Sequence, residues 1–276
     1  MKASLRPFCI LILMMIAAIS LEAQDGGDIS SFRFLPSRRL VHDFIADGTA
    51  HRFSAILLSS SDVQVGVGGI LPVLDYDPWG IPVQVSLGAS IQARLDPGQS
   101  IAVQSSEFSV DFFLLDAQLS DDLIVRTGMT HSSHHLGDGL NGDSTILPID
   151  YSRDDAQLYV IHSLSFLRGQ AYAGVRYAYN LVIRQPNKKR LVIHAGMHAP
   201  LWSFSQDLSL FAGGDIKIRQ ELSYGTSQRC EAGLQYRSEA GRIIRLVVSY
   251  SGGFDERGQF LGKRRSEAGV GIVIVL

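Results

Sequence analysis

The chain has 276 residues, enough for one large domain, and its 25 basic and 27 acidic residues give a formal net charge of −2 at pH 7. Nucleic-acid binding requires a strongly basic face, and this near-neutral charge does not indicate one, so nucleic acid is excluded as an expected partner. Beyond the N-terminal region there is no apolar run of about 18 residues, which excludes a membrane-spanning helix from the expected fold.

The N-terminus has the pattern of a secretory signal peptide over residues 1–23. Lys2 and Arg6 precede an apolar run over 8–19, and Leu21-Glu22-Ala23-Gln24 follows, with a plausible cleavage point after Ala23. The run is too short to cross a bilayer as a helix. We therefore expect this segment to be removed on export.

Residues 24–50 are polar and irregular, and we expect them to form a periplasmic N-terminal segment. Residues 51–276 show alternation of apolar and polar residues, and helical periodicity is scarcely visible. The alternation predicts about twelve strands, within a range of ten to fourteen. They lie near 51–60, 62–70, 80–95, 104–116, 121–133, 153–166, 170–183, 190–198, 207–219, 227–237, 242–252 and 266–276.

The alternation is cleanest in the second half, where Leu210 and Ile216 share one face of a strand while Lys217 and Arg219 share the other. A soluble sandwich would also alternate, because its core face is apolar. Two features favour a barrel. Strands of about 10 or more residues suit a tilted membrane strand, and charges of both signs at mid-strand suit a polar lumen. The sequence therefore predicts an all-β fold, an antiparallel transmembrane β-barrel in the bacterial outer membrane, with outer-membrane lipid or lipopolysaccharide as partner.

The densest chemistry lies in residues 129–139, which hold three histidines, two serines and an aspartate where a predicted strand meets a glycine-rich loop. Period two places His131 and Ser133 together on the apolar, lipid-facing side, near the extracellular rim. Their Cα atoms are then about 7 Å apart, so the imidazole can accept the hydroxyl proton. Asp154, in the next strand, is nominated to orient the histidine. The alternatives for this acid are Asp138, Asp143 and Asp150.

The run from His131 to Asp138 resembles the H-x-S-S-H-L-G-D-E signature of the domain-of-unknown-function 1207 family of bacterial outer-membrane proteins. The resemblance extends over most of the chain after the signal, including Tyr151-Ser152-Arg153-Asp154. It departs from the signature at two positions, where His134 replaces the second serine and Gly139 replaces the final glutamate. If that glutamate orients a catalytic group, this chain has lost it. The family is uncharacterised, so the resemblance implies no activity.

A shorter resemblance carries chemistry. His131-x-Ser133 is similar to the H-x-S of outer-membrane phospholipase A and of the lipid A deacylase. In those families the pair sits on the outer wall of a barrel, near the extracellular rim. The resemblance implies that Ser133 is the nucleophile and His131 the base, with Asp154 or a loop acid as the orienting group. The implied activity is that of a serine-dependent lipid esterase or deacylase.

Two other interpretations of the same run stay open. Histidine, serine and glycine at a strand end also hydrogen-bond backbone and lipid headgroups, which would make the protein a non-enzymatic structural, transport or adhesion barrel. Metal binding is the other, although consecutive strand residues point in opposite directions and cannot all converge on one ion. The donors in the run are His131, His134, His135 and Asp138. A candidate calcium set without the EF-hand spacing is Asp138, Asn141 and Asp143.

Overall fold

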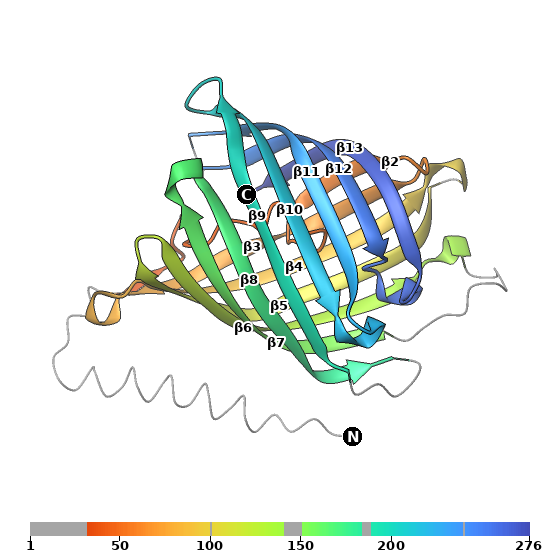
Figure 1. The fold of residues 1–276 in the computed structure, drawn as a ribbon, viewed down its shortest axis with the longest axis horizontal. Coiled ribbons are helices and arrows are strands. Elements are labelled where there is room, and N and C mark those ends of the chain that lie inside the picture. The colour runs from red at the N-terminus through yellow and green to blue at the C-terminus, as the bar shows by residue number, and fades with distance from the viewer. Residues whose placement is uncertain (1–31, 100, 141–150, 184–188, 240) are drawn as a thin grey trace.

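The fold is described from a computed structural model. It describes residues 32–99, 101–140, 151–183, 189–239 and 241–276. Within them, twelve antiparallel strands form a ring that closes because the last strand pairs with the first strand of the ring (Figure 1). The predicted all-β barrel is confirmed, and its strand number is the predicted twelve. The predicted signal peptide at 1–23 lies outside the described residues.

Each predicted stretch overlaps one strand of the ring, and several strands extend beyond the predicted bounds. The ring strands are β2 (Phe53–Leu58), β3 (Val63–Tyr76), β4 (Val83–Asp96), β5 (Ala102–Ser120), β6 (Leu123–Leu136), β7 (Tyr151–Leu164), β8 (Gly169–Val182), β9 (Leu191–Ser203), β10 (Leu208–Arg219), β11 (Gly225–Arg237), β12 (Ile243–Phe254) and β13 (Arg264–Val275). A short additional strand, β1 (Phe32–Phe34), pairs with the far end of β3, which the shorter β2 leaves free.

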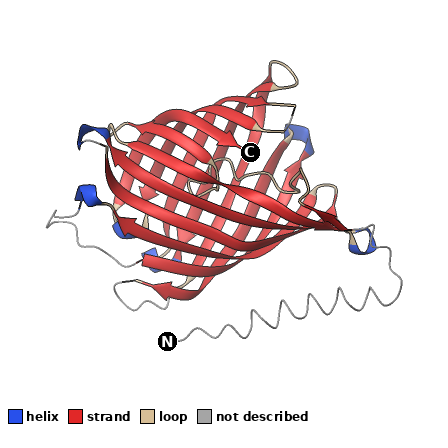
Figure 2. Cartoon of the chain, turned by 180° about the vertical axis from the view of Figure 1, so that it is seen from behind, coloured by secondary structure: helices blue, strands red, loops and turns tan. Residues whose placement is uncertain are grey.

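The described helices are single 3-10 turns in the links between strands (Figure 2). They are η2 (Pro78–Gly80), η3 (Pro97–Gln99), η4 (Asp138–Leu140), η5 (Ser165–Leu167), η6 (Gln220–Leu222) and η7 (Gly258–Phe260). Among the described residues, none of these helices has the length or the apolar content to cross a membrane.

The wall is apolar outside and charged inside. Val270 and Leu246, on the outward faces of β13 and β12, are 56% and 54% exposed, whereas Asp155, Lys217 and Glu231 are at most 2% exposed on inward faces. Two stacked soluble sheets would have buried the apolar faces instead. So large an apolar exterior is stable where it faces hydrocarbon. The barrel therefore spans a membrane, and its apolar faces look outward as the alternation predicted.

Residues 38–52, called the luminal segment below, lie inside the ring (Figure 1). Val41, Ile45 and Ala46 in this segment are no more than 4% exposed. The prediction of a periplasmic segment over 24–50 is therefore wrong from residue 38 onward. The physical reason is that this stretch carries apolar side chains and charges whose partners project from the inner wall, and it gains more by burial than by solvation.

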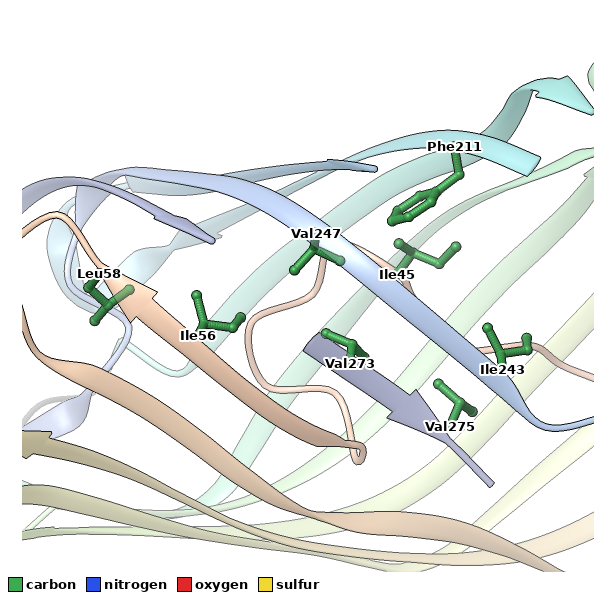
Figure 3. Close-up of a cluster of buried hydrophobic side chains, with 8 residues drawn as sticks. All are labelled: Ile45, Ile56, Leu58, Phe211, Ile243, Val247, Val273 and Val275. Carbon is green, nitrogen blue, oxygen red and sulfur yellow. The ribbon is translucent and has the colours of Figure 1, made fainter. Parts of the chain in front are cut away.

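Apolar contacts hold the luminal segment against separate parts of the wall. The ring of Phe44 stacks on Tyr172 of β8, with centroids 3.7 Å apart and planes 9° from parallel. Ile45 belongs to a different buried cluster, in which Phe211 of β10 and Val247 of β12 take part (Figure 3). Since β8 and β12 lie four strands apart in the ring, the segment bridges the lumen.

A buried cation ties the luminal segment to the wall and to a link. Nζ of Lys217, on β10, lies 2.6 Å from Oδ1 of Asp47 and 2.9 Å from Oε1 of Glu256, in the link after β12. Burial raises the pKa of Asp47, but the Lys217 ammonium outweighs burial and holds this pKa well below its usual range. The pKa of Glu256 is lowered in the same way. Carboxylates with depressed pKa values stabilise the fold above their unfolded pKa, and this contribution is lost as the pH falls through the folded pKa.

Replacing Lys217 with methionine is expected to lower the free energy of unfolding by about 3–5 kcal/mol, because the buried Asp47 and the partly exposed Glu256 lose their cation. Urea unfolding in detergent, followed by tryptophan fluorescence, measures the change. Arg33→Ala is the matched control. It removes an exposed ion pair to Asp75, for which the expected loss is at most about 1 kcal/mol. A Lys217 variant as stable as the wild type would contradict the assigned role.

Candidate active site on the outer wall

The register of β6 against β7 places the residues of the predicted site. His131 stands directly opposite Asp154, and Ser133 opposite Ser152. Ser132, between them, faces inward and is 6% exposed, whereas His131 and Ser133 are half-buried on the outward face. The structure thus places His131 and Ser133 on the lipid-facing wall, where period two predicted them.

His131 and Asp154 are in direct contact. Nδ1 of His131 lies 2.6 Å from Oδ1 of Asp154, and both side chains stay partly accessible. The other oxygen, Oδ2, accepts a 2.7 Å hydrogen bond from Nδ2 of Asn180 on β8. A hydrogen-bonded chain therefore runs across three neighbouring strands. Asp154 is the acid that the sequence nominated first, whereas Asn180 was not predicted.

The geometry leaves one imidazole nitrogen for chemistry. Because Nδ1 of His131 is engaged by Asp154, Nε2 is the atom that can accept a proton. In the described part of the chain, the hydroxyl of Ser133 makes no hydrogen bond, to His131 or to another residue. The Cα atoms of residues two apart on a strand are separated by about 7 Å. Contacts between nucleophile and base are often loose without substrate, so this spacing suits the predicted pair.

His134, on the inward face of the motif, makes contacts with the link between β12 and β13 and with β7. Nδ1 of His134 accepts a 2.9 Å hydrogen bond from the backbone N–H of Gly258, and the carbonyl of His134 accepts one from Nε2 of Gln259. Its ring also meets the ring of Tyr151 edge-on, with centroids 4.8 Å apart. These contacts hold the link between β12 and β13 folded into the lumen. His134 is thus a structural residue, and it does not share a face with His131.

The glycine of the motif is required by a close approach of two strands. The backbone N–H of Gly137 donates to the carbonyl of Gln104 at 2.8 Å. A Cβ at position 137 would lie 2.0 Å from the carbonyl oxygen of Val103. No side chain fits there without moving the backbone, so glycine fixes the end of β6 against β5.

The proposed metal ligands of the motif do not converge. His131 and His134 point to opposite sides of the wall, and His134 is buried inside it. His135 and Asp138 are exposed at the end of β6 and at the start of η4. The remaining two residues of the calcium set, Asn141 and Asp143, lie outside the described residues.

A buried cluster that the sequence did not reveal offers metal-ligating atoms in the lumen. It consists of Asp47, His194 and Asp215, whose ligand atoms lie within 4.8 Å of one another. Nε2 of His194 lies 2.5 Å from Asp215 and its Nδ1 lies 2.7 Å from the hydroxyl of Tyr159. Lys217 supplies the positive charge beside Asp47. Both imidazole nitrogens and the carboxylates are thus already satisfied by protein groups.

The surroundings of the outward pair are apolar and aromatic. Phe108 of β5 lies directly opposite Ser133 and is 40% exposed, and Tyr177 and Tyr179 of β8 are similarly exposed on the same wall. Polar side chains on a lipid-facing wall are costly, and the cost rises toward the bilayer midplane. A histidine, an aspartate and an asparagine joined by hydrogen bonds in such a wall therefore mark a candidate functional site.

These features define an outer-membrane β-barrel with a polar site on its lipid-facing wall, and the architecture places the protein in the bacterial outer membrane. No family model matches the chain, and no curated protein matches it. The β domain of the Bordetella autotransporter BrkA is similar with a TM-score of 0.37 and 12% identity, over 82% of this chain and 97% of that chain. The Pseudomonas putida toluene transporter TodX is similar with a TM-score of 0.37 and 11% identity, over 77% of this chain and 69% of that chain. Membership of the domain-of-unknown-function 1207 family stays a prediction.

Replacing Gly137 with alanine is expected to cost about 1–3 kcal/mol of stability, because the added Cβ overlaps the backbone of β5. Thermal unfolding in detergent measures the loss. Gly69→Ala is the matched control, since a Cβ at position 69 meets nothing within 4 Å. Equal stabilities of the two variants would show that the close approach at position 137 is unimportant.

Proposed function

We propose that the protein is a serine-dependent lipid hydrolase, an esterase or deacylase that acts on phospholipid or on the lipid A part of lipopolysaccharide. Ser133 is the nucleophile, His131 the general base, and Asp154 the acid that orients His131. One observation carries the proposal. The 2.6 Å contact between His131 and Asp154 lies on the lipid-facing wall, with Ser133 two residues further along the same face.

The proposed reaction follows from this arrangement. Nε2 of His131 takes the proton of the Ser133 hydroxyl as Oγ attacks the acyl carbonyl carbon. The imidazolium then donates this proton to the leaving group as the acyl bond to that group breaks. Water then attacks the carbonyl carbon of the acyl-enzyme while Nε2 of His131 takes a proton from it. The bond to Oγ of Ser133 breaks, the imidazolium returns the proton to Oγ, and the fatty acid leaves. Asp154 keeps the Nδ1–H tautomer and stabilises the imidazolium throughout.

The height of the site in the wall suits acyl bonds of lipids. Ser133 stands three residues before β6 ends at Leu136. This distance corresponds to about 10 Å along the strand, or about 7 Å of depth for a strand tilted by about 45°. Tyr177 and Tyr179 are exposed on the same wall, and tyrosines are enriched at the membrane interface, which is the level of the acyl bonds of lipids. Transport through the lumen is less favoured, because the luminal segment bridges it.

Purified protein in mixed micelles is expected to release fatty acid from phospholipid or from lipid A, and Ser133→Ala is expected to lower the rate by at least about 10³-fold. Ser132→Ala is the matched control, because it removes the same hydroxyl from the inward face and should keep the activity. His131→Ala should match the loss of the Ser133 variant, and Asp154→Ala should lose about 10²–10⁴-fold.

The outcome also decides between the enzymatic and the non-enzymatic interpretations. Activity that survives both Ser133→Ala and His131→Ala would remove the proposed catalytic pair. A wild-type protein that releases no fatty acid from either lipid class would leave a structural or adhesion barrel. Parallel assays with calcium and with a chelator test whether the candidate calcium set has a role in the activity.

A further inference from the structure

An irregularity in β8 lies next to the candidate site. Along β7 and β8, Asp155 pairs with Ala178, but the next residue, Asp154, pairs with Asn180. Tyr179 is therefore an extra residue, a β-bulge, and it has no partner on β7. Such a bulge reverses the side-chain alternation for the residues that follow it.

The bulge decides which side chain meets Asp154. Ala178 faces inward and is fully buried, whereas Tyr179 and Asn180 are both exposed although they are consecutive. In a regular strand Tyr179 would stand opposite Asp154, and Asn180 would point into the lumen. The extra residue turns the Asn180 amide onto the outward face, where Nδ2 lies 2.7 Å from Oδ2 of Asp154.

A side chain from the following strand link supports the bulge. Nη1 of Arg190 donates hydrogen bonds to the carbonyls of Ala178 and Tyr179, at 3.0 Å and 2.7 Å. The backbone N–H of Ala178 donates in turn to the carbonyl of Arg190 at 3.1 Å. Regular pairing of β8 with β9 ends at Tyr177 opposite Leu191. The guanidinium of Arg190 therefore satisfies carbonyls that the ladder no longer reaches.

We propose that Asn180 is a positioning residue of the outward site and that Arg190 holds the bulge that delivers it. The Asn180 amide fixes Oδ2 of Asp154, so that Oδ1 stays directed at Nδ1 of His131. A carboxylate is an acceptor only, so the atom of Asn180 that faces it is the donating nitrogen. Without the Asn180 donor, Oδ2 of Asp154 would lose its hydrogen bond on a wall with little water. The carboxylate would then be free to rotate, and Oδ1 would no longer stay directed at the imidazole. The kinetic part of this proposal rests on the proposed function.

The kinetic test compares two changes at one position. Asn180→Ala and Asn180→Leu, which keeps the branched shape, are both expected to lower kcat about 10–100-fold with little change in KM, because the base is misplaced while the lipid-binding wall is kept. The leucine variant keeps the branched shape and removes the donor, so it separates hydrogen bonding from packing. Arg190→Ala should shift kcat in the same direction. Tyr236→Phe, on the outward face of β11 and away from the site, is the control and should leave kcat unchanged.

A second readout needs no substrate. In protein with ¹⁵N-labelled histidine, the Nδ1 proton of His131 should give a far-downfield signal in slow exchange with water, assigned by its loss in His131→Ala. Asn180→Ala and Asn180→Leu should broaden or remove this signal, and Tyr236→Phe should keep it. Wild-type protein without the signal, or an Asn180→Leu variant that retains it at wild-type intensity, would overturn the proposal. If the wild type hydrolyses no lipid, the proposed function fails, and the signal still decides the role of Asn180.

Discussion

The structure depends on one constraint, which is that a wall facing hydrocarbon must satisfy its backbone polar groups within itself. Pairing of β13 with β2 meets the constraint by closing the ring. Closure then gives the wall two faces. The outer face must be apolar because it meets hydrocarbon, and the inner face encloses the charged side chains. Charges placed inside have no bulk water, so each needs a partner. Lys217 finds two of them in Asp47 and Glu256, neither of which belongs to a strand. The luminal segment is thus a consequence of the charged interior.

The motif in β6 serves both faces at once. Alternate residues of a strand point in opposite directions, so one short run delivers His131 and Ser133 to the lipid side and His134 to the lumen. Outside, the run meets Asp154 and forms the candidate site. Inside, His134 anchors the link that follows β12. A dense cluster of polar residues in a strand therefore does not mark a single site. Residues that point outward form the candidate site, and residues that point inward support the fold.

The alternation of side chains between the two faces of a strand also explains what could and could not be predicted from the sequence. It gave the twelve strands and the outward placement of His131, Ser133 and Asp154, because each depends on local alternation. It could not place the luminal segment, which has no periodicity and whose partners are as distant in sequence as Lys217. The role of Asn180 could not be predicted either, since a bulge adds one residue and moves the side chains that follow it to the opposite face. Such insertions are invisible in a pattern of apolar and polar residues, and they change which side chains meet.

The luminal segment has a consequence for the order of assembly. It directly precedes β2, the strand that completes the seam, and the contact between Asp47 and Lys217 joins residues 170 positions apart. Closing so long a loop is entropically expensive, and no such contact forms until β10 has taken its place. The luminal segment therefore reaches its final contacts late in folding, after β10 has joined the sheet. The stretch that leads the chain into the first strand of the ring is thus among the last parts of the protein to take its final place.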